Sequence, residues 1–253
     1  MKRWTIATVG AACVLTGWSV AGCSAGSSGS AATSSPPAGT ATSATASPTA
    51  PATVGTIPYD VRSPMSPGRY KTVSFRPAFT FSTTVTAGGG ADAPDVANFA
   101  LKAYRNASFA EFYFLRFAKV CDPKAPSRLT APPRQLLNCV VHNPHLRVTA
   151  KPSPVMIGGI SGQQLDVQVV GTPPGPQSCN GDPYPCVRVG RTPDFPPTFD
   201  GGFGAAFETN DSARIWIFDI HGATVAVALS DLTTHFAANL AAAEKIMQTV
   251  RFS

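Results

Sequence analysis

Hydrophobic and polar positions divide the chain into three stretches with different patterns. The first, from Trp4 to Cys23, is apolar and uncharged and follows two basic residues, Lys2 and Arg3. The second, to about residue 55, is polar but almost free of charge. From residue 56 to residue 253, short alternating or amphipathic runs are separated by Gly and Pro. The third stretch therefore predicts one folded domain of about 200 residues, which is enough for a single core.

Several runs of this domain have the length and composition of β-strands. The run Glu111–Val120 is the most aromatic in the chain, and its apolar residues fall on both faces. One face carries Phe112, Phe114 and Val120, and the other carries Tyr113, Leu115 and Phe117. This pattern predicts a central strand covered on both sides. Further strands are expected at residues 69–75, 78–86, 146–150, 155–157, 163–170, 214–221 and 223–229.

Glycines mark three turns between these strands. Residues 88–90 (GGG) predict a flexible turn, and residues 158–162 (GGISG) predict a turn between two strands. The pair His221-Gly222 lies between the two strands predicted at 214–229, where a two-residue hairpin turn needs positive φ. A tight hairpin is therefore expected there.

Two helices are predicted. Thr130 is expected to cap a short one, with Pro132-Pro133 in its first turn and Asn143-Pro144 at its end. Its apolar face would consist of Leu136, Leu137, Val140 and Val141.

The second helix is expected to begin at Asp231 or Thr233. Its apolar residues recur at spacings that place them on one face, and they are Phe236, Leu240, Ala243 and Met247. The final residues, 249–252 (TVRF), would form a closing strand or an extended tail. The expected fold class is α+β: a largely antiparallel sheet with a short middle helix and a C-terminal helix packed on it.

The start of the chain has the features of an export signal. Lys2 and Arg3 precede a short apolar core, and small residues come after it, which is typical of a signal peptide rather than of a spanning helix. The sequence Val20-Ala21-Gly22-Cys23 resembles the lipobox of bacterial lipoproteins. That resemblance implies lipid on Cys23, removal of residues 1–22, and a location at the extracytoplasmic face of the cell membrane. An ordinary signal peptide or an uncleaved anchor are the alternatives.

The segment after the lipobox is distinguished by its composition. Residues 23–55 are mostly Ser, Ala, Thr, Gly and Pro, so they predict a disordered tether that bears the lipidated cysteine. The formal charge of +6 falls to +4 when Lys2 and Arg3 are removed, and no basic run occurs in the domain. Clustered Lys and Arg would be needed for a nucleic-acid partner, so none is expected.

The cysteines of the domain predict disulfides. Cys13 lies in the signal and Cys23 in the lipobox, which leaves Cys121, Cys139, Cys179 and Cys186. An even number in an exported chain indicates two disulfide bonds. Three pairings are possible; the local one, 121 with 139 and 179 with 186, is the simplest.

A metal site is the competing interpretation of one cysteine. Cys139, His142 and His145 are close in sequence. However, the cysteines lack paired zinc-ribbon spacing, and Pro144 places His145 beyond the helix that carries His142. No metal and no cofactor are therefore predicted.

The sequence lacks the common catalytic motifs. The chain contains no H-E-x-x-H, G-x-S-x-G, S-x-x-K or phosphate-binding loop. Its acidic residues show no spacing that singles out a catalytic carboxylate pair. The candidates for such a pair are Asp166, Glu208, Asp219, Asp231 and Glu244. No catalytic residue is assigned.

Four segments carry a second resemblance: PGRY…FRPAFTF, NPHLRVTAKPSPVMIGGISGQQLDV, IFDIHGATVAVAL and AEKIMQTVRF. They resemble uncharacterised secreted proteins and lipoproteins of actinobacteria, from Pro67 onward. The end of the chain is also similar, over a short stretch, to some actinobacterial lipoproteins with a PsbP-like fold. The matching motifs are turns and strand ends, so the resemblance implies no chemistry.

The expected function is that of a membrane-anchored envelope lipoprotein with a non-enzymatic domain that binds a small hydrophobic ligand or an envelope component. The alternative is a hydrolase or other enzyme acting on envelope material, with a site formed by the loop of residues 171–204.

Overall fold

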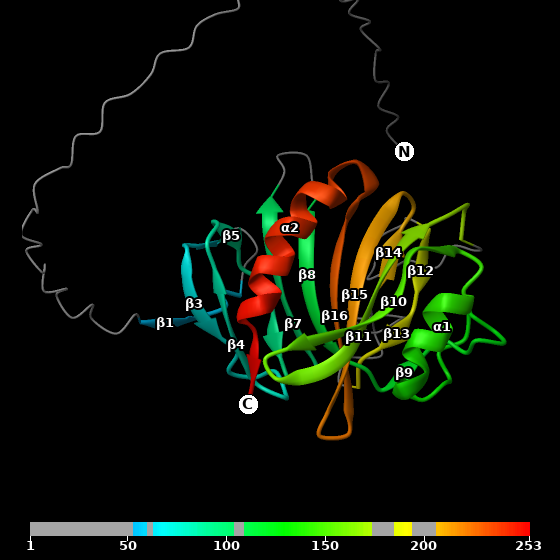
Figure 1. The fold of residues 1–253 in the computed structure, drawn as a ribbon, viewed down its shortest axis with the longest axis horizontal. Helices are drawn as coiled ribbons and strands as arrows, with labels where there is room; N and C mark the ends of the chain where they lie inside the picture. The colour runs from blue at the N-terminus through cyan, green and yellow to red at the C-terminus, as the bar shows by residue number, and fades with distance from the viewer. Residues whose placement is uncertain (1–52, 60–62, 104–108, 174–184, 194–205) are drawn as a thin grey trace, which may run out of the picture. The chain divides into compact units, whose positions relative to one another are not determined.

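Strand β8 (Phe109–Arg116) lies in the middle of a large antiparallel sheet, between β16 (Ala223–Leu232) and β7 (Val96–Ala103). The computed structural model describes residues 53–59, 63–103, 109–173, 185–193 and 206–253 (Figure 1). Within them this sheet has nine strands in the order β10-β11-β15-β16-β8-β7-β5-β2, with β6 paired to β7. The other members are β10 (Leu146–Ile157), β11 (Ile160–Val169), β15 (Asp211–Ile220), β5 (Ala87–Gly88), β2 (Pro64–Met65) and β6 (Asp92–Ala93).

Smaller sheets and two α-helices complete the described residues. A four-stranded sheet contains β1 (Val54–Thr56), β3 (Gly68–Lys71), β4 (Phe79–Thr83) and β17 (Arg251–Phe252), with β1 parallel to β3. Two strand pairs join β12 (Cys186–Arg188) to β14 (Ala206–Glu208) and β9 (Lys119–Val120) to β13 (Gly190–Arg191). The helices are α1 (Leu136–His142), after the 3-10 turn η1 (Pro133–Gln135), and α2 (Thr233–Thr249). The coarse class is therefore α+β and mostly antiparallel, with one short middle helix and one C-terminal helix.

The described residues belong to one compact unit, Thr49–Ser253. Its first strand, β1, begins at Val54, so this strand includes Val54 and Gly55, the last two residues assigned to the tether. Residues 1–52, with the signal segment, Cys23 and most of the tether, lie outside the described residues.

The alternation of β8 divides the interior into two cores, one on each face of the central sheet. Phe112 and Phe114 point into the first, and Leu115 into the second. The aromatic core contains Phe79, Phe81, Phe99, Phe112, Phe114, Trp216 and Phe218 from the strands and Ala243, Ile246 and Met247 from α2. The disulfide core contains Leu115, Val120, Cys121, Leu136, Cys139, Val140, Leu165, Val167, Ala213, Ile215, Ala226 and Ala228. The prediction of a central strand covered on both sides is confirmed.

The prediction for Val120 is wrong. The sequence pattern places it on the face of Phe112 and Phe114, but it belongs to the disulfide core. The reason is that β8 ends at Arg116 and the chain breaks its alternation before β9, where Val120 pairs with Gly190.

The β15–β16 hairpin has the predicted turn. His221 has φ 53° and Gly222 has φ 81°, as a two-residue turn with two left-handed residues requires. The Asp219 carboxylate adds to the turn by accepting a hydrogen bond from the Gly222 N–H at 2.9 Å.

Strand β10 corrects the prediction of two separate strands at residues 146–150 and 155–157. It runs unbroken from Leu146 to Ile157, with shifts of register near Ala150. Pro152 and Pro154 fit within it because β10 is the edge strand of the sheet, where a missing N–H donor is tolerated. The predicted turn at Gly158 is confirmed, although residues 160–162 belong to β11.

Helix α2 presents its predicted face to the aromatic core. Ala243 and Met247 are buried there, and Phe236 and Leu240 pack against it. Polar contacts add to this packing: Arg214 on β15 forms ion pairs with Asp166 on β11 and Glu244 on α2. Thr233 is the first helical residue, but the N-cap is Leu232 and no side chain caps the helix. Among the described residues, no helix has the length and apolar character needed to cross a membrane.

Two local predictions are wrong. Thr130 does not cap the middle helix, since η1 precedes α1 and neither has a side-chain cap. Residues 88–90 do not form a flexible turn either, because Gly88 belongs to β5 and the next two glycines are buried. A Cβ on Gly90 would lie 2.0 Å from the carbonyl oxygen of Asn98, so these glycines allow close approach of two backbones.

Candidate functional site

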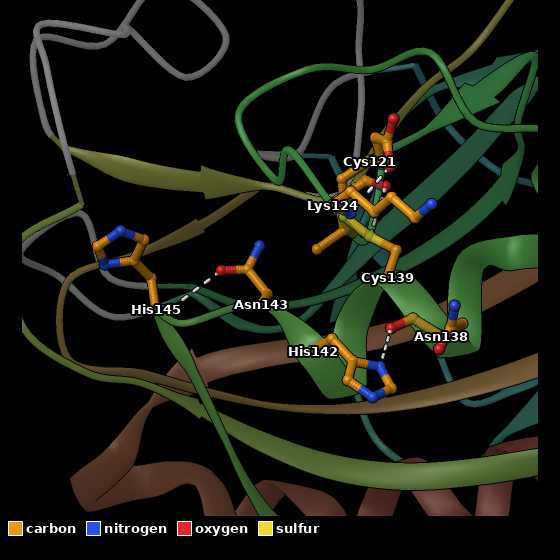
Figure 2. Close-up of a disulfide and its surroundings, with 9 residues drawn as sticks. Cys121, Lys124, Asn138, Cys139, His142, Asn143 and His145 are labelled. Carbon is orange, nitrogen blue, oxygen red and sulfur yellow. Dashed lines mark hydrogen bonds between the residues drawn. A yellow bond between two sulfur atoms is a disulfide. The ribbon is translucent and has the colours of Figure 1, made fainter.

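A disulfide joins Cys121, which comes directly after β9, to Cys139 on α1. The two Cα atoms are 5.5 Å apart, and both residues have no exposed surface. Figure 2 shows the bond between α1 and the segment that carries Lys124. This is one of the two local pairs considered from the sequence, and it fastens α1 to the disulfide core.

The histidines near this bond have separate local roles. The Nδ1 atom of His142 lies 2.9 Å from the carbonyl oxygen of Asn138, one turn back on α1. The backbone N–H of His145 donates a hydrogen bond to the Asn143 side-chain oxygen at 3.0 Å, and this bond closes the turn after the helix. Figure 2 shows the two imidazoles on different sides of this turn, away from each other. Because Cys139 is in a disulfide, its sulfur is no thiolate ligand, and the three residues form no metal-ligand set.

The remaining cysteines are only partly described. Cys186 is disulfide-bonded and begins β12. Cys179 and Cys23 lie outside the described residues, as does most of the loop of residues 171–204 in which the enzyme alternative expects a site. Among the described residues, no group of three or more His, Cys, Asp and Glu side chains could hold a metal ion.

Carboxyl groups gather at one end of the central sheet, on the side of the disulfide core. Glu111 lies opposite Ser230 in the β8–β16 register, and Asp211 begins β15. The Asp211 carboxylate accepts hydrogen bonds from the Glu208 N–H at 2.9 Å and from the Ser230 hydroxyl at 3.0 Å. The same group of residues thus links β14, β15 and β16.

Burial governs the protonation of these groups. Burial, together with the negative charges of Glu208 and Asp211, raises the pKa of Glu111 to about 7. Burial also raises the pKa of Asp211 to about 6, against the opposing effect of its two hydrogen bonds. Carboxyl groups that titrate near neutral pH can serve in proton transfer, and such shifts gather at functional sites.

This pair is not apparent from the sequence. Glu208 is a candidate there, but Glu111 and Asp211 are not, because the two lie about a hundred residues apart and only strand pairing unites them. One signal was available: Glu111 alternates with Tyr113 and Leu115, so the predicted two-sided strand already placed its carboxyl on a covered face.

Two grooves open on the surface of the domain. One, of about 220 Å³, is lined by Pro126, Asn143, His145, Pro173, Val187 and Arg188, among others. The second, of about 460 Å³, lies where the β15–β16 turn meets the end of β8 and η1. Its lining includes Arg116, Phe117, Pro132, Arg134, Asp219 and Thr224. Both combine proline walls with a few polar groups, an arrangement that can bind a ligand.

Comparison with known proteins yields little. No protein-family model matches the chain, and no curated protein matches it. A crystal structure from Pseudomonas aeruginosa, of PA94, a protein of unknown function described as a candidate regulator, aligns with 65% of this chain and 89% of its own, at 19% identity and a TM-score of 0.35.

Proposed function

We propose that this chain is an envelope lipoprotein. It is exported, cut before Cys23, and held by lipid on that cysteine at the extracytoplasmic face of the cell membrane. Residues 24–55 serve largely as a tether, and the folded domain binds a ligand or an envelope partner without catalysing a reaction.

The observation that carries the proposal is the disulfide between Cys121 and Cys139. Both cysteines are fully buried within a core, so the bond is part of the fold and not a surface accident. Such bonds persist in oxidising compartments and are rare where thiols are kept reduced. A structural disulfide therefore supports export, which is the step that the signal-like start and the lipobox-like VAGC would bring about.

The grooves favour binding over catalysis. Each presents proline, aromatic or aliphatic walls with isolated polar groups, and the described lining of neither one brings a histidine together with a carboxylate. Fixed walls with a few polar groups are typical of ligand sites.

The anchor can be tested with two cysteines of the same leader. We expect Cys23→Ser to abolish incorporation of labelled fatty acid, and the chain to leave the membrane fraction or remain as an uncut precursor. Cys13→Ser is the matched control, which should be lipidated and retained like the natural chain. Mature-sized Cys23→Ser chain that stays in the membrane would refute the lipoprotein proposal.

One observation favours the enzyme alternative, namely the near-neutral titration of Glu111 and Asp211. If these groups perform acid–base chemistry, purified chain should release soluble fragments from isolated envelope material. Glu111→Gln should then abolish the release, whereas Glu244→Gln, at a half-exposed ion pair, should leave it unchanged. Absence of any release by the natural chain would remove the enzyme alternative and leave the binding role.

A further inference from the structure

Two guanidinium groups line the larger groove. Arg116, at the end of β8, directs Nε and Nη2 to one oxygen of Asp95. The Asp95 side chain is 3% exposed and that of Arg116 is 36% exposed, so the buried carboxylate holds the guanidinium from the protein side. The Arg116 side chain is thereby positioned at the surface, where it lines the groove.

The second guanidinium of the lining belongs to Arg134. Arg134 stands on η1 and is exposed. Within the described ranges it has no hydrogen-bond or ion-pair partner. The groove thus has one guanidinium that is held in place, that of Arg116, and one that is unengaged, that of Arg134. Such a pair suits an oxyanion, because the planar N–H fork of arginine matches carboxylate and phosphate oxygens.

The described lining also contains one carboxylate, that of Asp219. Asp219 accepts a hydrogen bond from the Gly222 N–H in the hairpin turn, so its charge is held in place at the groove. A negative charge at that place weakens the attraction for an anion without removing the guanidinium donors. The groove therefore contains two groups whose alteration should change anion binding in opposite directions.

We propose that this groove binds a small anionic ligand, whose carboxylate or phosphate group is held by Arg116 and Arg134 while its apolar part lies against Phe117 and the neighbouring prolines. The volume of about 460 Å³ suits a molecule of metabolite or headgroup size. This inference rests on the binding role proposed above and supplies the chemical class of the ligand.

The test is a titration of the full chain, purified in detergent, with glycerol phosphate and with succinate, and with glycerol as the neutral control. We expect saturable binding of at least one anion with a dissociation constant of about 1 mM or tighter, reported by NMR shifts at Thr224 and Ala223. Mixed micelles with phosphatidylglycerol or with phosphatidylcholine distinguish the source: preference for the former over free glycerol phosphate assigns the oxyanion to a lipid headgroup.

Three variants decide whether the groove is responsible. Arg134→Glu should weaken binding about 10-fold or more, through loss of a charge-assisted hydrogen bond. Asp219→Asn keeps an acceptor for the Gly222 N–H and should tighten binding about 2- to 5-fold. Lys151→Ala, an exposed cation on the distant edge strand β10, is the control and should have no effect. Arg116 is left intact because its loss would remove an ion-pair partner of the buried Asp95 carboxylate.

Failure of this inference differs from failure of the proposed anchor. Absence of anion binding by the natural chain, or equal binding by Arg134→Glu and Asp219→Asn, overturns the groove assignment whatever the fractionation of Cys23→Ser shows. Retention of mature Cys23→Ser in the membrane overturns the anchor and leaves the titration valid.

Discussion

The two faces of the central sheet are held by different means. On one face, rings of Phe81, Phe99, Phe112 and Trp216 stack nearly parallel across the strands, with interplanar angles of 5° to 9° between neighbours. On the other, the sheet contributes small or aliphatic side chains such as Ala213, Ala226 and Ala228, and α1 is fastened by a covalent bond.

This difference results from the size of the buried side chains. Aromatic side chains each bury a large apolar area, so the aromatic core holds the 17-residue α2 mainly by packing, and the ion pair of Arg214 with Glu244 adds to it. Alanines bury little, and α1 has only seven residues. A disulfide compensates for a small contact area by restricting the unfolded chain. One core is thus secured by contact area and the other by a cross-link.

The aromatic core should be the more sensitive to a single truncation. Phe112 has no exposed surface and stacks on both Phe99 and Trp216. We expect Phe112→Ala to lower the free energy of unfolding by about 3–5 kcal/mol, because it removes apolar contacts and leaves a cavity. Urea unfolding measures this. Met156→Ala, at a side chain that is 69% exposed on β10, should change it by less than about 0.5 kcal/mol. Equal effects of the two would contradict the assignment of the core.

The disulfide core should depend on its cross-link. The cysteines are 18 positions apart, and removing the bond by Cys121→Ala/Cys139→Ala should cost about 3 kcal/mol in thermal unfolding, chiefly through greater freedom of the unfolded chain. The second pair expected from the sequence, Cys179 with Cys186, would close a shorter loop, so Cys179→Ala/Cys186→Ala should cost less. A larger loss from the second pair would show that its loop, and not α1, secures this face.

The smallest effect concerns pH. Burial raises the pKa of Glu111 from an ordinary 4.5 to about 7, so the folded state binds this proton more tightly than the unfolded chain does. The stability from this group is complete below about pH 4.5 and is lost as the pH rises through about 7. Glu111→Gln should therefore raise the free energy of unfolding by about 1–2 kcal/mol at pH 8, after allowance for partial exposure, and change it little at pH 4.

Thermal unfolding between pH 4 and pH 8.5 measures this dependence. Glu244→Gln, which alters the exposed member of the Arg214 ion pairs, is the control and should retain the slope of the natural chain. If the melting temperature of the natural chain rises from pH 5 to pH 8, the carboxyl group at Glu111 is not the buried acid described here.

The parts of the fold that the sequence determined by itself are short-range. His221-Gly222 specifies a turn because few residues accept positive φ, and the spacing of Ala243 and Met247 specifies a helix face because the helical period is constant. The alternation of Phe112 with Leu115 likewise indicated a strand with two covered faces. Each of these features is fixed by neighbours within a few residues.

Tertiary structure alone decided the rest. Gly90 is closely packed because the Asn98 backbone lies against it, and Pro152 stays within a strand because that strand is an edge. The electrostatic coupling of Glu111 with Asp211, and the place of Arg116 and Arg134 in the lining of one groove, involve segments whose distance along the chain has no period to read. Patterns of neighbouring residues report which face is buried, but the identity of what lies against that face depends on strand order, and strand order results from the packing of the whole domain.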